Sequence, residues 1–205
     1  MVRVFWSVLI VAALSLPGVS AFACVNGVEA EVNFEVEMLS KSERLLEQGK
    51  HREALKVVMR SFPNAFTARG SFARRARTVA AVVTVRTGGQ YALRADAAKV
   101  TSARVRQRNI KTAVEILRKN HARSPGNPLH TSRYAEGLAQ LPAQHPRALE
   151  LLEGLAKRDL LSDAEAWGVL ARLRAAKGDA AGGLDAQKRC ERMASNPDIC
   201  VTPNG

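Results

Sequence analysis

Three cysteines are the side chains of this sequence with the clearest chemistry, and two of them stand near its end. Cys190 and Cys200 are ten positions apart, whereas Cys24 stands alone near the start. No Cys-x-x-Cys redox pair exists in the chain, so in an oxidising compartment we expect a structural disulfide between Cys190 and Cys200. It would fold the tail 195–205 back onto the last helix, and such a short loop contributes about 3 kcal/mol in the chain-entropy model.

The four histidines share no metal-ligand spacing, and no catalytic motif accompanies them. The chain lacks a Gly-x-Ser-x-Gly elbow, a His-Glu-x-x-His zinc motif, a phosphate loop and the fingerprint Gly-x-Gly-x-x-Gly. All four stand in or beside expected turns, where surface residues are more common than ligands: His51, His121, His130 and His145. We therefore expect a protein without metal or cofactor that is not an enzyme.

The first 23 residues have the pattern of a secretory signal peptide. An arginine at the start is followed by an almost unbroken apolar run over residues 4–16, which ends in Pro-Gly ahead of small residues. The run is shorter than the about 20 residues of a permanent membrane span. We expect cleavage after Ala21 or after Ala23. The second site would leave Cys24 at the new N-terminus as a candidate for lipidation, while plain export is the simpler interpretation.

Beyond the leader, the sequence favours helices that pack through small side chains. Alanine, leucine and arginine are abundant, and the β-branched run 79–85 continues a helical spacing that starts at Phe72. Helix boundaries are marked by cap and turn signals. These signals are Asn127-Pro128, His145-Pro146, the capping-box pair Ser162 and Glu165, and Gly178 followed by Asp179. The last helix is expected to carry Leu184, Gln187, Cys190 and Ala194 along one face.

The segment from Ala164 to Pro197 has the spacing of a tetratricopeptide repeat. A large apolar anchor, a leucine, small residues and a turn glycine stand where that repeat has them: Trp167, Leu170, Ala171, Gly178, Gly183 and Cys190. Small residues also recur at equal intervals, at Ala113, Ala148 and Gly183. The chain thus resembles a tetratricopeptide-repeat protein. The resemblance extends to the hairpin 36–62 and weakens over 67–123, with a break near Gly88-Gly89.

The resemblance implies an all-α fold, a short solenoid of antiparallel helical hairpins over residues 36–194. We expect residues 24–35 to form an extended N-terminal segment and 195–205 a tail. Stacked first helices of such hairpins line a concave surface, so the function implied is a non-enzymatic protein-binding or scaffolding module of the bacterial cell envelope. It would be periplasmic, secreted or lipid-anchored. The partner protein stays unidentified, because such repeats serve many unrelated roles.

The net positive charge of the chain is confined to residues 69–123. Fourteen Lys or Arg stand there against Asp96 and Glu115, a net of +12 that equals the net charge of the whole chain. Four of them fall on one expected helix: Arg104, Arg106, Arg108 and Lys111. Concentrated charge attracts anions, so the alternative function is a structural envelope component that binds anionic lipid or cell-wall polymer. A solvated helix face explains the same composition. Nucleic acid is the least expected anion, because only Phe72 and Tyr91 could stack on bases.

Overall fold

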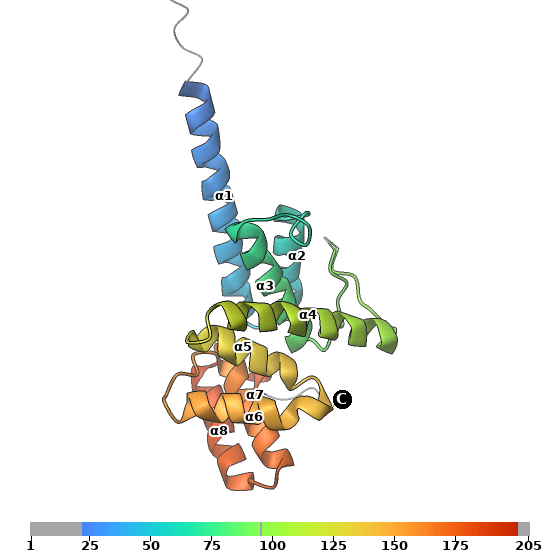
Figure 1. Cartoon of the computed structure of the whole chain (residues 1–205), viewed down its shortest axis with the longest axis vertical. Helices are drawn as coiled ribbons and strands as arrows, with labels where there is room; N and C mark the ends of the chain where they lie inside the picture. Colours follow the sequence, from blue (N-terminus) through green and yellow to red (C-terminus); the bar gives the residue numbers. More distant parts are fainter. Residues whose placement is uncertain (1–21, 95, 201–205) are drawn as a thin grey trace, which may run out of the picture. The chain divides into compact units, whose positions relative to one another are not determined.

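A computed structural model describes residues 22–94 and 96–200. Within these ranges all regular secondary structure is helical, apart from an isolated bridge between Tyr91 and Lys99 (Figure 1). The all-α prediction is confirmed. The α-helices are α1 (Phe22–Glu47), α2 (His51–Ser61), α3 (Ser71–Arg86), α4 (Ala103–Arg123), α5 (Pro128–Leu138), α6 (His145–Ala156), α7 (Ala164–Ala176) and α8 (Ala180–Met193). Short 3-10 helices span Pro142–Gln144 and Pro197–Ile199.

The expected leader covers residues 1–23. Residues 1–21, with the expected cleavage site after Ala21, lie outside the described part of the chain. The chain divides into two units, residues 1–33 and 34–205. The first unit contributes the N-terminal part of α1, which includes Cys24, and the second contains all other elements. Within the described ranges, no helix has the length and apolar character needed to cross a membrane.

The extended conformation expected for residues 24–35 is wrong, because α1 runs through this segment. Its three glutamates and Ala30 favour a helix, and it contains no proline to stop one. Apolar and polar residues alternate here, so a helix distributes the apolar ones around its circumference. Val32, Phe34 and Val36 are accordingly 42%, 50% and 42% exposed.

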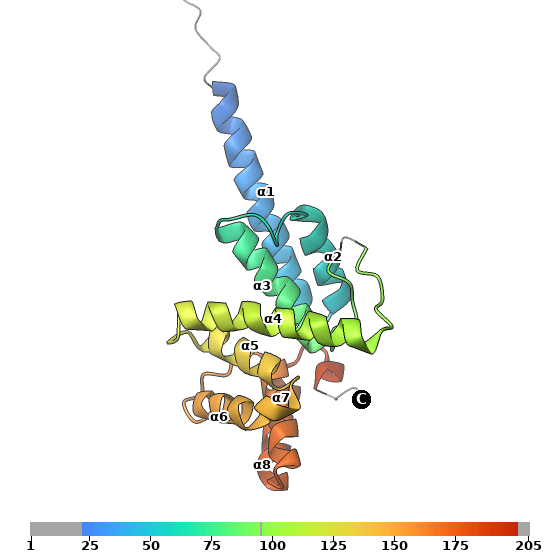
Figure 2. The same cartoon turned by 45° about the vertical axis from the view of Figure 1, so that its right-hand side comes forward.

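The helices from α2 to α8 pack in chain order, each against the next. Additional contacts join α3 to α5 and α5 to α7, so these three odd-numbered helices form a row. In Figures 1 and 2, α4 crosses between α3 on one side and the group α5–α8 on the other. The loop residues 87–94 and 96–102, which begin near the expected break at Gly88-Gly89, extend beside the N-terminal end of α4 (Figure 2).

Two hydrophobic clusters fill the interior, one on each side of this crossing. The first joins α1, α2 and α3 to the buried face of α4, with Leu39, Leu55 and Val83 among its fully buried side chains. The second joins α4 to α5, α6, α7 and α8, with Leu152 and Leu170 at its centre. Both clusters use α4, so this helix is the shared wall of the two cores.

The last hairpin places its repeat-like residues as their types require. Trp167 is 3% exposed, and its indole Nε1 donates a hydrogen bond to the carbonyl oxygen of Leu161 at 3.1 Å. Gly178 has a φ of +93°, the left-handed geometry that ends α7. A Cβ on Gly183 would lie 3.1 Å from the carbonyl oxygen of Ala171, a tight contact, so the glycine favours the close approach of α7 and α8. The side chains of Leu170 and Ala171 are buried.

Two expectations for this hairpin are wrong. Leu184 does not share the buried face of Cys190: it is 57% exposed, because α8 instead buries the small residues Gly183, Ala186 and Cys190. The capping box of Ser162 and Glu165 does not form either. Asp163 occupies the cap position of α7 without a side-chain cap hydrogen bond, and Glu165 is directed toward a charged cluster in the interior.

The expected disulfide between Cys190 and Cys200 is present, with Cα atoms 5.8 Å apart. It carries the tail beyond the last helix to the turn between α1 and α2. There Ser195 Oγ donates a hydrogen bond to the carbonyl oxygen of Glu47 at 3.1 Å, and Ile199 packs over Gly49. A regular open solenoid separates its first and last hairpins, whereas this tail joins them.

Candidate ligand-binding groove

A polar groove of about 510 Å³ opens between the C-terminal half of α1, α3, α5 and the C-terminal end of α4. Its volume falls within the range of about 300–1,000 Å³ that is typical of ligand sites. The charged side chains that line it are four arginines and two glutamates: Arg74, Arg75, Arg123, Arg133, Glu43 and Glu47. We call this cavity the α1–α3–α5 groove. These residues come from four separate helices, so no local sequence pattern marks them as a group.

The four arginines of the groove differ in how far their charge is already compensated. Arg75 donates a hydrogen bond through Nε to Glu43 Oε1 at 2.8 Å, and this carboxylate raises the pKa of Arg75. Arg133 Nε lies 3.7 Å from Asp163 Oδ2 and makes no hydrogen bond although it is buried. Arg74 and Arg123 have no ion pair among the described residues. The groove therefore has an excess of positive charge.

The floor of the groove is a hydrogen-bonded pair of buried polar side chains. Asn120 Nδ2 donates to Thr78 Oγ1 at 2.8 Å, and this hydroxyl donates to the carbonyl oxygen of Arg74 at 2.9 Å. His130 also lines the groove, and its pKa is lowered by burial and by the nearby Arg133 and His121. Its imidazole is therefore neutral near pH 7. The positive charge of the groove comes from guanidinium groups alone.

A buried ion cluster lies behind the groove and is centred on Arg86, the last residue of α3. Arg86 Nε and Nη2 donate to the two carboxylate oxygens of Glu136 at 2.8 and 3.1 Å, and Nη2 also donates to Asp163 Oδ2 at 3.0 Å. Arg86 Nη1 lies 2.9 Å from Glu165 Oε1, at an angle that makes no hydrogen bond. The side chains of Arg86 and Glu136 are only 6% and 2% exposed. One guanidinium thus holds three carboxylates.

The pKa values in this cluster follow from burial and mutual charge. Burial by itself would lower the pKa of Arg86, but Glu136, Glu165 and Asp163 outweigh it and raise that pKa further above its usual range. Burial raises the pKa of Glu136 against the effect of Arg86. For Glu165, burial is outweighed by Arg86 and by His51, whose Nε2 is 3.7 Å away, and the pKa is lowered.

The ion cluster connects four helices to the groove. Arg86 ends α3, Glu136 lies within α5, Asp163 and Glu165 stand at the start of α7, and His51 begins α2. Cations at a helix C-terminus and anions at a helix N-terminus also interact favourably with the helix dipoles. Because Arg133 contacts Asp163 from the groove side, the cluster supports one wall of the groove. A sequence signal for it exists in Arg86, which directly follows the apolar run 79–85.

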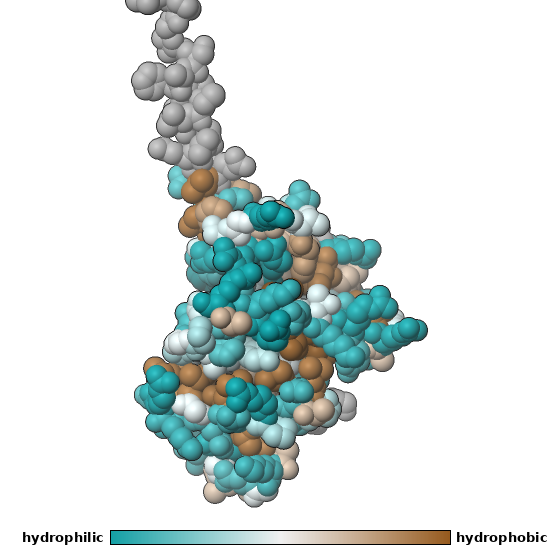
Figure 3. All heavy atoms as spheres, viewed as in Figure 1, coloured by the Kyte–Doolittle hydropathy of each residue, from teal (hydrophilic) through white to brown (hydrophobic). Residues whose placement is uncertain are grey.

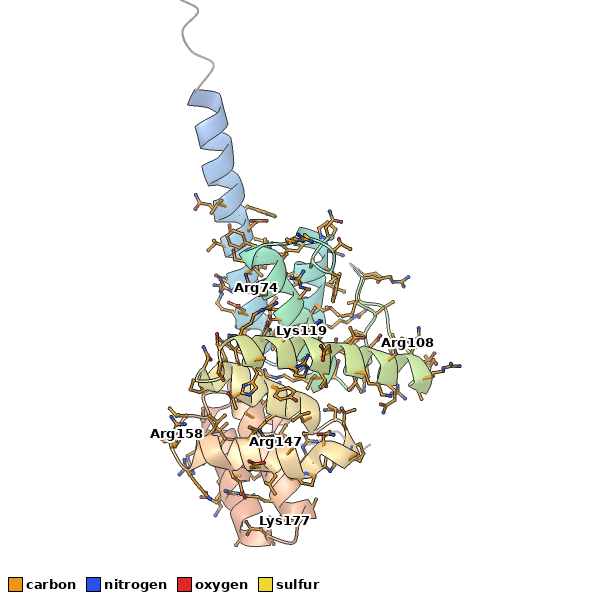
Figure 4. The ribbon with its side chains drawn as sticks, viewed as in Figure 1. Arg74, Arg108, Lys119, Arg147, Arg158 and Lys177 are labelled. Carbon is orange, nitrogen blue, oxygen red and sulfur yellow. A yellow bond between two sulfur atoms is a disulfide. The ribbon has the colours of Figure 1, made fainter. Side chains whose placement is uncertain are left out.

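The basic residues expected to bind anions lie elsewhere. Three of the four, Arg104, Arg108 and Lys111, are exposed on the N-terminal half of α4, and Arg106 is half-buried. None of them has an ion pair among the described residues. Figure 4 shows Arg108 near the end of α4 that projects beyond the other helices. Arg123 is at the opposite end of α4, about 22 Å from Arg108 at 1.5 Å rise per residue. The groove and the basic end of α4 are therefore separate sites.

Much of the remaining charge in residues 69–123 is compensated locally. Glu115 accepts hydrogen bonds from Arg118 and forms a second ion pair with Lys119, which together lower its pKa to about 2. Arg94 pairs with Asp96, and Arg77 donates to backbone carbonyl oxygens. A count of charges from sequence therefore overstates the number of cations that are free to bind an anion.

Two of the four histidines, His121 and His145, are used for packing and local hydrogen bonds. His121 stacks on Tyr134 with ring centroids 5.4 Å apart, and the ring of His145 is 3.0 Å from the carbonyl oxygen of Ala139. Over the described ranges, no group of three or more His, Cys, Asp or Glu side chains could hold a metal ion.

A second cavity, of about 460 Å³, lies between α6 and α7 and has a more apolar lining that includes Leu149 and Leu173. Figure 3 shows apolar surface as a band over α5 and α6, beneath the hydrophilic face of α4.

Comparison with known proteins finds no match: no family model, no curated protein and no solved structure is significantly similar to this chain.

Proposed function

We propose that this protein is a non-enzymatic binding module that holds a segment of a partner protein in the α1–α3–α5 groove. The observation that carries the proposal is the groove itself, a cavity of about 510 Å³ whose walls come from three first helices of successive hairpins. The row formed by α3, α5 and α7 supports a tetratricopeptide-like stacking of these hairpins. The spacing of residues 164–197 supports the same interpretation.

The proposed location is the bacterial cell envelope, after export. The Cys190–Cys200 disulfide supports it, because structural disulfides persist in oxidising compartments and are rare in the cytosol. The leader-like sequence of residues 1–23 supports it independently. Lipidation of Cys24 belongs to the same proposal as an alternative to plain export, and the intact mass of the mature protein distinguishes the two.

Site-directed photo-crosslinking tests the groove as the place of binding. A benzophenone amino acid replaces Ser71, an exposed residue at the groove, and in a matched variant it replaces Lys188, which is exposed on α8. In living cells of the source organism, we expect a discrete protein adduct from position 71 only. Adducts of equal yield from both positions, or none from position 71, would contradict the proposal.

A second candidate function is binding of anionic lipid or wall polymer by the basic end of α4. The observation that favours it is the exposure of Arg104, Arg108 and Lys111 without ion pairs in the described structure. We expect the triple change Arg104→Glu, Arg106→Glu and Arg108→Glu to weaken binding to phosphatidylglycerol vesicles. The difference from wild type should shrink as salt rises from about 0.1 M to about 1 M, where the Debye length falls from about 10 to about 3 Å.

A control variant with two charge reversals outside both basic sites separates this site from general electrostatics. Lys157 and Arg158 are exposed, belong to neither basic site and make no ion pair in the described residues. The double change Lys157→Glu and Arg158→Glu should alter vesicle binding much less than the reversals on α4. Equal losses would show that only net charge matters, and the basic end of α4 would then be a solvated face.

A further inference from the structure

We propose that the α1–α3–α5 groove selects an acidic segment of its partner protein, with carboxylates held by Arg74 and Arg123. The inference rests on the proposed function and adds the chemistry of the ligand. Arg74 comes from α3 and Arg123 from the end of α4, and both line the groove without an ion pair among the described residues. Figure 4 shows Arg74 on α3, away from Arg108 at the projecting end of α4.

The charge balance of the groove favours an anion. Of its two carboxylates, Glu43 is already bound to Arg75, which leaves Glu47 against three guanidinium groups. The third of these, Arg133, has only the loose contact of 3.7 Å with Asp163, and Arg86 already binds that carboxylate more closely. A guanidinium presents several N–H donors in a planar fork that matches a carboxylate, so two or three such groups around one cavity form a strong carboxylate-binding site.

The other lining groups favour a polypeptide over a lipid surface. Asn120, Thr78, Ser71 and Ser124 supply amide and hydroxyl groups to the same cavity, where they can bond the backbone of an extended segment. The methylene stems of glutamate or aspartate would contact the apolar side chains of the groove, Val79 and Leu129. A membrane surface is too broad to enter a cavity of about 510 Å³. The acidic groups can be side chains or the terminal carboxylate of the partner.

Fluorescence anisotropy with short synthetic peptides tests this inference on the full-length mature protein. The probes are a labelled penta-glutamate with an amidated C-terminus, the same peptide with a free C-terminal carboxylate, and an amidated penta-glutamine. We expect both glutamate peptides to bind and the glutamine peptide to bind at least about tenfold more weakly, because a neutral amide cannot form the charge-assisted hydrogen bonds that a carboxylate makes with guanidinium groups. Tighter binding of the free-carboxylate peptide would assign the terminal carboxylate to the site.

Variants connect the binding to the groove. The double change Arg74→Glu and Arg123→Glu should weaken penta-glutamate binding by about tenfold or more. The double change Arg74→Gln and Arg123→Gln removes the two positive charges without adding negative ones, so it should give a smaller loss. The control Lys157→Glu with Arg158→Glu has the same change in net charge and should stay within about twofold of wild type. Melting temperatures of all variants confirm that each is folded.

Three results would overturn the inference. They are equal affinity for the glutamine peptide, equal losses in the groove and control variants, and competition by inorganic phosphate as effective as that by penta-glutamate at equal concentration. The crosslinking experiment at position 71 tests the proposed function independently of these outcomes. A partner that crosslinks there, and whose binding is unaffected by the Arg74 and Arg123 changes, would leave the groove as a protein site and remove its acidic preference.

Discussion

Replacement of Arg86 by methionine is expected to lower the free energy of unfolding by about 3–5 kcal/mol. Methionine has a similar length but no charge, so the carboxylates of Glu136, Asp163 and Glu165 would lose the cation that they share. Removal of one partner from a buried ion pair leaves an uncompensated charge in a medium of low dielectric constant, and this is the source of the large effect. Urea unfolding followed by circular dichroism at pH 7 measures it.

The pH dependence of this effect has a definite sign. In the wild type, the lowered pKa of Glu165 contributes stability above its unfolded pKa that is lost on acidification, whereas the raised pKa of Glu136 acts in the opposite direction. Without Arg86, all three carboxylates lose their main stabilising charge, so their pKa values in the folded state should rise. The loss caused by Arg86→Met should therefore be smaller near pH 5 than at pH 7, because the variant binds more protons when folded.

Two further variants identify the cause of the loss. Arg74 lies on the same helix as Arg86 but has no ion pair in the described structure. Arg74→Met should therefore change the free energy of unfolding by less than about 0.5 kcal/mol. Glu136→Gln combined with Arg86→Met should recover part of the loss, which a double-mutant cycle measures as a coupling energy between contacting residues. If Arg86→Met behaves like Arg74→Met, the buried ion cluster does not exist as described.

Truncation of Trp167 to alanine should also cost about 3–5 kcal/mol. The indole ring is 3% exposed, and its removal loses transfer free energy and leaves a cavity between α7 and its neighbours. It also removes the hydrogen bond to Leu161 and the stacking of the Arg189 guanidinium, which lies 4.7 Å from the ring centroid. Thermal and urea unfolding of the variant measure the loss.

Leu184 supplies the matched control on the partner helix. The sequence pattern places it on the same face of α8 as Cys190, whereas the structure leaves it 57% exposed. Leu184→Ala should therefore cost far less than Trp167→Ala, in contrast to the 2–5 kcal/mol that is typical when a buried leucine is truncated. A loss of that size at Leu184, or an unchanged melting temperature for Trp167→Ala, would show that the register of the last hairpin is wrong.

Local sequence signals predicted the helices near the C-terminus well because caps and turns depend on few residues. Asn127 accepts a hydrogen bond from the backbone N–H of His130 at 3.1 Å, and Asp179 accepts one from Gly182 at 2.8 Å, as their types and positions indicate. Where a side chain has a stronger distant partner, the local rule fails. Glu165 belongs to a capping-box pattern in the sequence, but the charge of Arg86, 79 positions earlier in the chain, determines its orientation.

The sequence by itself determined the all-α class, most helix starts, the disulfide and the buried place of Trp167. Each of these follows from hydrophobic spacing, cap residues or cysteine count, which act over one or two helical turns. Only the tertiary structure brought Arg74, Arg123 and Arg133 to one groove and surrounded Arg86 with three carboxylates. Charge–charge energy depends on separation in space and on burial, and neither can be read from positions far apart in a chain.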